Sequence, residues 1–261
     1  MDTRPIGMFD SGVGGLTVYK EIRKMFPNED VIYYGDTKSF PYGNKSKESI
    51  IGLTKKGIDF LISKNVKAII IACGTATSQA LETMRCLYTI PIIGIIDSSA
   101  KYIAKQLNLN TIGVVATSGT IRSNGWQLAL LKYNSSLHII NKPCPLLALM
   151  AEEGWTNNQI ADLTIGEYMK ELYNVDALIL GCTHYPLFTN IFKKYLKTGA
   201  LIINTGTIIA QDLCTILKDN LLNFPTHTGN LDIYLTDTVC NFVFVADKLL
   251  NNSNLVIHNV L

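Results

Sequence analysis

Ala68-Ile-Ile-Ile-Ala-Cys73-Gly-Thr75 and Ala177-Leu-Ile-Leu-Gly-Cys182-Thr-His184 share one pattern: a short apolar run, a small residue, a cysteine and a polar pair. Neither run alternates polar with apolar residues, and this predicts parallel strands buried on both faces. Ligands of open parallel sheets bind just beyond the carboxyl ends of the strands. The two cysteines are therefore predicted to lie where such a sheet binds its ligand.

Similar apolar runs alternate with helix-like stretches along the rest of the chain. The predicted strands are Ile6–Phe9, Val31–Tyr34, Ala68–Ala72, Ile92–Ile96, Ile112–Val115, Leu137–Asn141, Ala177–Leu180, Leu201–Ile203 and Asp232–Leu235. The predicted helices are Leu16–Met25, Ser46–Lys64, Thr77–Tyr88, Ala100–Leu107, Gly125–Leu131, Asn157–Leu172, Leu187–Leu196 and Ile208–Leu217. This alternation indicates the α/β class, with mainly parallel sheets flanked by helices.

The cysteine pattern belongs to a longer internal repeat. The two cysteines are 109 residues apart, segment 6–12 resembles segment 112–119 at an offset of 106, and segment 92–98 resembles segment 201–206. The repeat predicts two pseudo-symmetric α/β domains with the active site in the cleft between them. We expect the first domain at 1–97 plus 208–261 and the second at 98–207.

Composition excludes several classes of protein. The 261 residues carry a net charge of +2, with Lys and Arg scattered among acids, so a nucleic-acid-binding surface is not expected. No apolar run approaches the roughly 20 residues that span a bilayer, and the N-terminus lacks a secretory signal. Six separated cysteines without a CxxC motif predict free thiols. We expect a cytoplasmic protein without a membrane partner.

Most of the cysteines are predicted to be structural. Cys86, Cys214 and Cys240 lie inside apolar patterns and are expected to be small buried hydrophobic residues. Cys144 lies between two prolines in a loop, and no role is assigned to it. Cys73 and Cys182 differ because each occupies the same place in the repeated pattern, next to polar residues.

Two thiols on opposite sides of a cleft can invert a carbon next to a carboxylate. One group removes the Cα proton from one face while the other protonates the opposite face. Thiols suit this chemistry because neighbours can move their pKa from about 8.5 toward the working pH. Asp10 is the predicted proton acceptor beside Cys73, and His184 is the predicted partner of Cys182. This chemistry needs no cofactor and no metal.

Other interpretations of these residues have less support. Gly12-Val13-Gly14-Gly15 opens a predicted helix but lacks the P-loop ending, so small-anion binding is favoured over phosphate binding. A zinc site at Cys73, Cys182 and His184 would need more histidine. A Cys182–His184 hydrolase would leave the other cysteine unexplained.

At these residues the chain resembles the glutamate racemases of the aspartate/glutamate racemase superfamily, over nearly its whole length. The matching segments are Phe9-Asp10-Ser11-Gly12-Val13-Gly14-Gly15-Leu16, Tyr34-Gly35-Asp36, Pro41-Tyr42-Gly43, Ala72-Cys73-Gly74-Thr75-Ala76, Gly119-Thr120-Ile121-Arg122-Ser123, Glu152-Glu153-Gly154 and Leu180-Gly181-Cys182-Thr183-His184-Tyr185-Pro186. The two cysteine motifs, in this order and at this separation, carry most of the resemblance.

The resemblance implies a cofactor-independent enzyme that interconverts L- and D-glutamate and supplies D-glutamate for peptidoglycan. It implies that Cys73 deprotonates the D-enantiomer and Cys182 the L-enantiomer, assisted by Asp10 and His184. Asp36 and Glu152 match supporting positions. The residues that match substrate-binding positions are Asp10, Ser11, Pro41, Tyr42, Gly43, Gly74, Thr75, Thr117, Thr120, Thr183 and His184. A homodimer is compatible with the family.

Structural roles are the alternative for the three carboxylates. Asp36 can cap the turn after its strand, Asp10 can cap the glycine-rich turn, and Glu152 can be solvated at a helix end.

The chain departs from the family pattern at Gly74, at Thr77, which replaces the more usual Ser but keeps the hydroxyl, and near Ala148 and Leu149. The family usually has Asn where this chain has Gly74, and this leaves the choice between glutamate and aspartate open. A non-catalytic protein that binds acidic ligands on the same fold is a further alternative. Near Ala148 and Leu149 the usual proline is missing, and we expect this change to affect a connecting segment rather than the chemistry.

Overall fold

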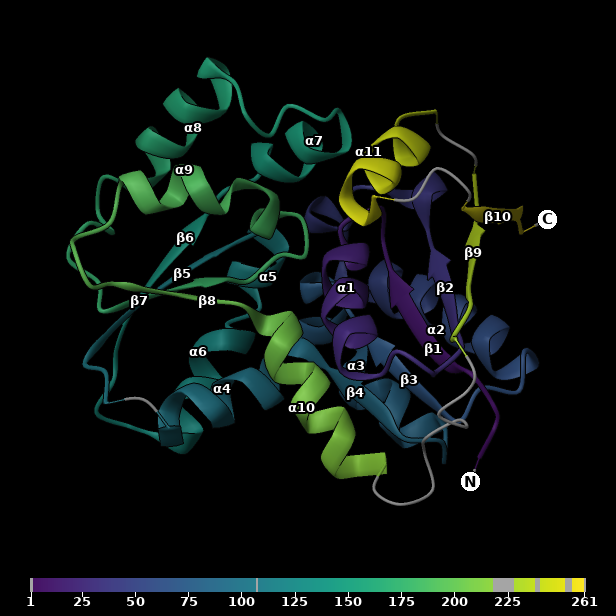
Figure 1. Cartoon of the computed structure of the whole chain (residues 1–261). Coiled ribbons are helices and arrows are strands. Elements are labelled where there is room, and N and C mark those ends of the chain that lie inside the picture. Colours follow the sequence, from purple (N-terminus) through teal and green to yellow (C-terminus); the bar gives the residue numbers. More distant parts are fainter. Residues whose placement is uncertain (1, 107, 218–227, 238–239, 252–254, 261) are drawn as a thin grey trace.

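The computed structural model describes residues 2–106, 108–217, 228–237, 240–251 and 255–260. These ranges form two sheets flanked by helices, and every strand pair described in them is parallel (Figure 1). The strands are β1 Ile6–Asp10, β2 Val31–Gly35, β3 Ala68–Ile71, β4 Ile92–Gly94, β5 Thr111–Ala116, β6 His138–Pro143, β7 Ala177–Leu180, β8 Leu201–Ile203, β9 Leu231–Leu235 and β10 Val256–Asn259. The predicted α/β class is confirmed.

Helices cover the faces of both sheets. The α-helices are α1 Gly15–Met25, α2 Lys47–Ser63, α3 Gly74–Leu87, α4 Ile95–Gln106, α5 Ser118–Arg122, α6 Gly125–Tyr133, α7 Leu146–Glu152, α8 Gln159–Met169, α9 Thr189–Lys194, α10 Thr205–Leu217 and α11 Cys240–Leu250. Short 3-10 helices lie at η1 Thr37–Ser39, η2 Tyr42–Asn44 and η3 Tyr185–Phe188.

The internal repeat is visible in the order of the strands. The larger sheet has the order β10-β9-β2-β1-β3-β4, and the smaller sheet has the order β6-β5-β7-β8. The run β2-β1-β3-β4 therefore corresponds strand for strand to β6-β5-β7-β8. Strands β9 and β10 extend the larger sheet beyond β2, so the end of the chain returns to the sheet in which it began. Both cysteine-bearing strands, β3 and β7, occupy equivalent positions.

Burial explains why these runs are strands. All of β3 and all of β7 are buried, as expected for central parallel strands covered on both faces. A single hydrophobic cluster includes Ile70 of β3 and Ile179 of β7 and continues through Ile103 of α4 and Ile209 of α10. Helices α4 and α10 pack against each other at this junction (Figure 1). The two sheets thus share part of one core.

Some predicted boundaries are wrong. Ile95 and Ile96 begin α4 instead of ending a strand, because the same apolar pair is buried equally well on the first turn of a helix. Helix α3 begins at Gly74, earlier than predicted, directly after Cys73. The predicted end of the fourth helix, Leu107, lies outside the described residues. Strand β10 and helices α5, α7 and α11 were not predicted.

The prediction for the structural cysteines is also wrong where the structure tests it. Cys86 and Cys214 are exposed, because each lies on the solvent side of its amphipathic helix. The side chain of Cys240 lies outside the described part of the chain, and Cys144 is buried. Within the described ranges, no helix combines the length and apolar character needed to cross a membrane.

Candidate active site

The two repeated cysteines meet at one small cavity between the sheets. Cys73 follows β3 at the N-cap of α3, and Cys182 follows β7 after Gly181. Both side chains are buried, at 5% and 6% exposure, and both line a cavity of about 20 Å³. Small-molecule sites usually start near 300 Å³, so this space is closed to an amino acid.

Cys73 is surrounded by polar groups, and its thiol is hard to ionise. Its Sγ lies 3.5 Å from Ser11 Oγ and accepts the N–H of Ala76 at 3.5 Å. Burial raises the pKa of the Cys73 thiol to about 12, and the negative charge of Asp10 acts in the same direction. A thiol with this pKa is almost never ionised near neutral pH, so it needs a nearby proton acceptor to act as a base.

Asp10 acts on Cys73 through its charge, and no hydrogen bond between its carboxylate and the sulfur is described. Its carboxylate accepts the N–H of Gly12 at 3.1 Å and the hydroxyl of Thr183 at 3.2 Å. Burial raises the pKa of Asp10 to about 6, against the favourable charge of His184. The residue is fully buried and ionised above that pH.

Cys182 is the first member of a chain of three polar groups. Its Sγ lies 3.6 Å from Nδ1 of His184, and Nε2 of His184 lies 2.6 Å from Oε1 of Glu152. Burial lowers the pKa of His184, but the hydrogen bonds to Cys182 and Glu152 outweigh it and the pKa lies well above its ordinary value. An imidazolium in this position lies within reach of the Cys182 sulfur and carries a proton next to it.

The glycine-rich loop holds carboxylates of the protein itself. The N–H of Val13 donates to Glu152 Oε1 at 2.8 Å, and the N–H of Gly12 donates to Asp10. The predicted binding of a small anion therefore does not fit these two groups, which are already bonded. Nor is Glu152 a solvated helix end, because its carboxylate joins this loop to His184.

Asp36 supports another residue of the cavity. Its buried carboxylate accepts the hydroxyl of Tyr42 at 2.6 Å and that of Thr236 at 2.8 Å. It occupies the N-cap position of η1 but makes no capping bond with its side chain, so the capping role is not supported. Asp36 does not line the cavity between the thiols, whereas Tyr42 does.

Three threonine hydroxyls form a triangle beside the thiols. Thr75 Oγ1 lies 2.8 Å from Thr117 Oγ1 and 3.1 Å from Thr120 Oγ1, and the last two are 3.0 Å apart. All three side chains are buried: Thr75 lies in α3 on one side, and on the other Thr117 caps α5 and Thr120 lies within it. Since hydroxyls can both donate and accept, this triangle can turn protons toward a carboxylate.

The cavity contains most of the predicted substrate-binding residues. Those that line it, beside the two thiols, are Ser11, Pro41, Tyr42, Gly43, Gly74, Thr75, Thr117, Thr183 and His184. Asp10 and Thr120 lie behind this lining and bond to members of it.

Sequence reasoning missed two residues of the cavity wall, Phe40 and Ala148. The ring of Phe40 lies 5.6 Å from the ring of His184, and Phe40 also lines an outer pocket of about 140 Å³. Its position directly before Pro41 and Tyr42 in the sequence could have indicated that it lines the cavity. Ala148 belongs to α7, so the expectation that the missing proline there affects only a connecting segment is wrong.

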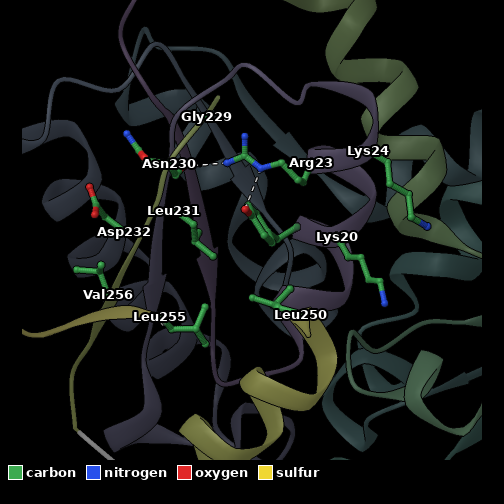
Figure 2. A pocket seen from close by; sticks show the side chains of 11 residues that line it. Lys20, Arg23, Lys24, Gly229, Asn230, Leu231, Asp232, Leu250, Leu255 and Val256 are labelled. Atoms are coloured by element: carbon green, nitrogen blue, oxygen red, sulfur yellow. Dashed lines mark hydrogen bonds between the residues drawn. The ribbon is translucent and has the colours of Figure 1, made fainter. Parts of the chain in front are cut away.

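A larger cavity, of about 520 Å³, lies away from the thiols between α1, β9 and β10 (Figure 2). Its cationic side chains already have partners in the protein. Lys20 donates to the Leu249 carbonyl, Lys24 pairs with Glu21, and Arg23 donates to Tyr19 and to backbone carbonyls that include that of Asn230. Neither thiol lines it, so the small cavity is the candidate active site.

The fold and the site define an α/β protein in which two buried thiols, each near a titratable partner, line one cavity between two related sheets. Residues 6–213 match the model of the family described as Asp/Glu/Hydantoin racemase, and the chain belongs to this family.

Known proteins are similar to this chain over nearly its whole length. A glutamate racemase from Geobacter metallireducens is 38% identical over 253 residues, which cover 96% of this chain and 94% of that protein. One from Sulfurihydrogenibium sp. is 44% identical, with 95% and 92% covered. The crystal structure of glutamate racemase from Francisella tularensis in complex with D-glutamate has a TM-score of 0.92 and 37% identity, and the match covers 100% of this chain and 98% of that one.

Proposed function

We propose that this chain interconverts L- and D-glutamate without an added cofactor, with Cys73 and Cys182 as the two acid/base groups. The observation that carries the proposal is that both thiols line one cavity from equivalent strands of the two sheets. Support for the substrate comes from the curated glutamate racemases of 38% and 44% identity and from the similar structure with bound D-glutamate.

The proposed reaction moves one proton off Cα and another onto it. With D-glutamate, the Cys73 thiolate takes the Cα proton while the Cys182 thiol protonates the opposite face. The product is L-glutamate, with Cys73 as thiol and Cys182 as thiolate. The reverse direction exchanges these roles, and a general acid–base pair of this kind contributes typically about 10²- to 10⁴-fold for each group.

Asp10 and His184 are proposed to set the starting protonation states. In the D-to-L direction, ionised Asp10 accepts the proton of the Cys73 thiol, whose raised pKa otherwise keeps it protonated, and Cys182 starts as the thiol. In the L-to-D direction, Cys73 starts as the thiol and Cys182 acts as the base beside His184, which is held by Glu152. We propose Asp36 as a positioning residue, because its described hydrogen bonds reach the cavity through Tyr42.

Glutamate has to be held by its charged groups. The hydroxyls of Ser11, Thr75, Thr117 and Thr183 line the cavity, and we propose that they bind the substrate carboxylates, with Thr120 supporting them from behind. Since the cavity has room for only about one water-sized molecule, the two sides must separate for the substrate to enter. We propose that the moving units are 1–97 plus 208–261 and 98–207.

The biological role follows from the product. We propose that the enzyme is cytoplasmic and supplies D-glutamate for peptidoglycan synthesis, and that a homodimer is its assembly. Aspartate is the alternative substrate, because Gly74 offers no side-chain amide at a position where the family usually has one. Kinetics with glutamate and aspartate measured side by side separate the two.

Solvent deuterium exchange tests the proposed chemistry. Wild-type enzyme should incorporate deuterium at Cα during racemisation of either enantiomer without pyridoxal phosphate. Cys73→Ser and Cys182→Ser should each lower racemisation by at least about 100-fold. Cys144→Ser is the matched control, because this buried thiol does not line the cavity. Full activity in either cavity variant, or a requirement for a prosthetic group, contradicts the proposal.

A further inference from the structure

Five glycines line the contact between the two sides of the candidate site. We call Gly12, Gly14, Gly43, Gly74 and Gly119 the glycine seam. At each of them, a Cβ atom would stand less than 3.0 Å from an atom across the contact, a separation that real Cβ atoms essentially never show. The two sides approach this closely because none of the five positions has a side chain.

Two members of the seam meet backbone rather than side chains. A Cβ at Gly74 would stand 2.3 Å from the carbonyl oxygen of Gly181, and one at Gly119 would stand 2.8 Å from the carbonyl oxygen of Gly43. A change of rotamer cannot relieve these contacts. At Gly12 and Gly14, by contrast, the nearest atoms belong to the side chains of Glu152 and His184, which can turn. Gly74 and Gly119 are therefore the positions where closure depends most strictly on glycine.

Hydrogen bonds join the two sides along the same contact. Thr17 Oγ1 donates to the Thr183 carbonyl at 2.8 Å, and the Thr75 and Thr117 hydroxyls are 2.8 Å apart. The bond from Val13 to Glu152 crosses the contact as well. The closed arrangement thus has direct polar contacts of its own, and it leaves only about 20 Å³ between the thiols.

We propose that Gly74 is the closure-determining residue of the site: its missing side chain lets the Gly181 carbonyl move over it, so that the molecule populates a closed arrangement which shields both thiols and excludes the substrate. Choosing glutamate kinetics as one readout rests on the proposed function. The closed arrangement itself does not.

The closed arrangement competes with binding. A protein whose binding-competent form is only a fraction of the population binds its ligand more weakly by that fraction. A Cβ at position 74 cannot coexist with the Gly181 carbonyl in its present place, so it shifts the population toward separated sides. Reagents then reach Cys73 and Cys182 more often, and the substrate meets a larger fraction of competent molecules.

Thiol labelling tests this shift without any turnover. Gly74→Ala, Gly74→Asn and wild-type protein are treated with iodoacetamide, and each cysteine is quantified by mass spectrometry. The exposed Cys86 and Cys214 are internal references. We expect labelling of Cys182 to rise on the order of tenfold in both variants, the size of a modest population shift. Because a Cβ at residue 74 meets Gly181, which precedes Cys182, Gly119→Ala is measured beside it: its Cβ meets the Gly43 carbonyl instead, so a rise of Cys182 labelling in that variant as well reports separation of the two sides.

Gly52→Ala is the matched control, because a Cβ at Gly52 meets nothing within 4 Å. It should label like wild type. Unchanged labelling of Cys182 in folded Gly74→Ala overturns the proposal. If thermal unfolding shows that the Gly74 variants do not fold, Gly119→Ala gives the same test at the other backbone contact, and unchanged Cys182 labelling there overturns it equally.

Kinetics separate closure from direct binding. A shared fall in KM in Gly74→Ala and Gly74→Asn, without a matching fall in kcat, reports the population shift. A fall in Gly74→Asn alone reports a new amide contact with the substrate and contradicts the closure role. If racemisation is absent in wild type, the proposed function fails while the labelling result still decides the inference about Gly74.

Discussion

Nε2 of His184 lies 2.6 Å from Oε1 of Glu152, so a carboxylate at the end of α7 controls the charge of the imidazole beside Cys182. The same oxygen accepts the N–H of Val13 at 2.8 Å and is thereby held in place from the opposite side of the cavity.

Glu152→Gln should move the pH dependence of activity. Removing the negative charge lowers the raised pKa of His184, so the alkaline limb of kcat/KM with L-glutamate shifts to lower pH. We expect kcat to fall about 10- to 100-fold. A pH–rate profile and NMR titration of His184 measure both effects. Glu153→Gln is the control, since Glu153 is exposed and bonds Asn241; an alkaline limb that does not move in Glu152→Gln contradicts the relay.

The same variant should change stability with a defined sign. His184 has a folded pKa above its ordinary value of 6.5, so its stabilising contribution is fully present below that pH and is lost as pH rises through the folded pKa. Glu152→Gln should therefore destabilise the protein more at pH 6 than at alkaline pH. Thermal unfolding of both proteins across pH measures this difference, and a parallel loss at all pH values argues against a charged His184.

Asp10→Asn should weaken activity and strengthen the fold. The pKa of Asp10 is raised from 3.8 to about 6, so proton uptake from Cys73 in the D-to-L direction fails as pH falls through 6. In the variant this acidic limb disappears and the rate falls at least about 100-fold. Ionising the buried Asp10 carboxyl costs free energy in the folded protein. This contribution lowers the stability of the wild type as pH rises from 4 to 6, and it is absent in the variant.

Above pH 6, Asp10→Asn should gain up to about 3 kcal/mol in the free energy of unfolding. The amide retains an acceptor for the Gly12 N–H. Denaturant unfolding at pH 4 and pH 8 measures this gain. Asp59→Asn is the control, because Asp59 lies on the surface and pairs with Lys55. If Asp10→Asn is less stable than wild type at pH 8, burial is not the cause of the raised pKa.

The threonine triangle makes a prediction about binding. Thr75→Val keeps the shape of the side chain but removes a hydroxyl that lines the cavity, so KM for glutamate should rise about tenfold or more at nearly constant kcat. Thr120→Val removes a hydroxyl behind the lining and should change KM less. Steady-state kinetics in both directions measure the difference. Equal effects of the two variants would show that the triangle acts only as a structural unit.

Tyr42→Phe tests whether Asp36 acts in catalysis or in positioning. Burial raises the pKa of Tyr42, and the negative charge of Asp36 raises it further. The phenol therefore stays protonated and donates to that carboxylate. Losing this bond to a buried charged group should cost about 1.5–3 kcal/mol in the free energy of unfolding. Activity of the folded variant should stay within severalfold of wild type, and the pH profile should not change. A new or lost limb in the pH–rate profile would instead place Asp36 in the proton path.

The sequence predicted the parts of the fold that depend on burial in the interior. Continuous apolar runs such as Ala177–Leu180 leave little choice but a central parallel strand, and the repeat of Cys73 and Cys182 predicted their equivalent places. Ile95 and Ile96 show the limit, since an apolar pair satisfies a strand and the buried face of a helix equally. Strand β10 lies at the sheet edge, where mostly exposed residues carry no strong pattern.

The residues of the candidate site were predictable where the type of the residue and its place at a strand end already indicate its chemistry. Thiols and hydroxyls at strand ends indicated Cys73, Cys182 and Thr75, but long-range pairing was hidden. Nothing in the sequence shows that Val13 bonds Glu152, 139 residues away, or that Ala148 reaches the cavity. These contacts depend on how the two sheets face each other, which local patterns do not determine.

The chain passes between the two sheets twice, through α4 after β4 and through α10 after β8, and these two helices pack together. In the proposed opening, these two adjacent crossings are the hinge, and the displacement of one side against the other grows with distance from them. Ile95, the first residue of α4, stands 3.7 Å from the Cβ position at Gly74. A single methyl group at residue 74, close to this hinge, would therefore turn a small local displacement into a larger one at the rim, where Phe40 and Glu152 line the outer pocket.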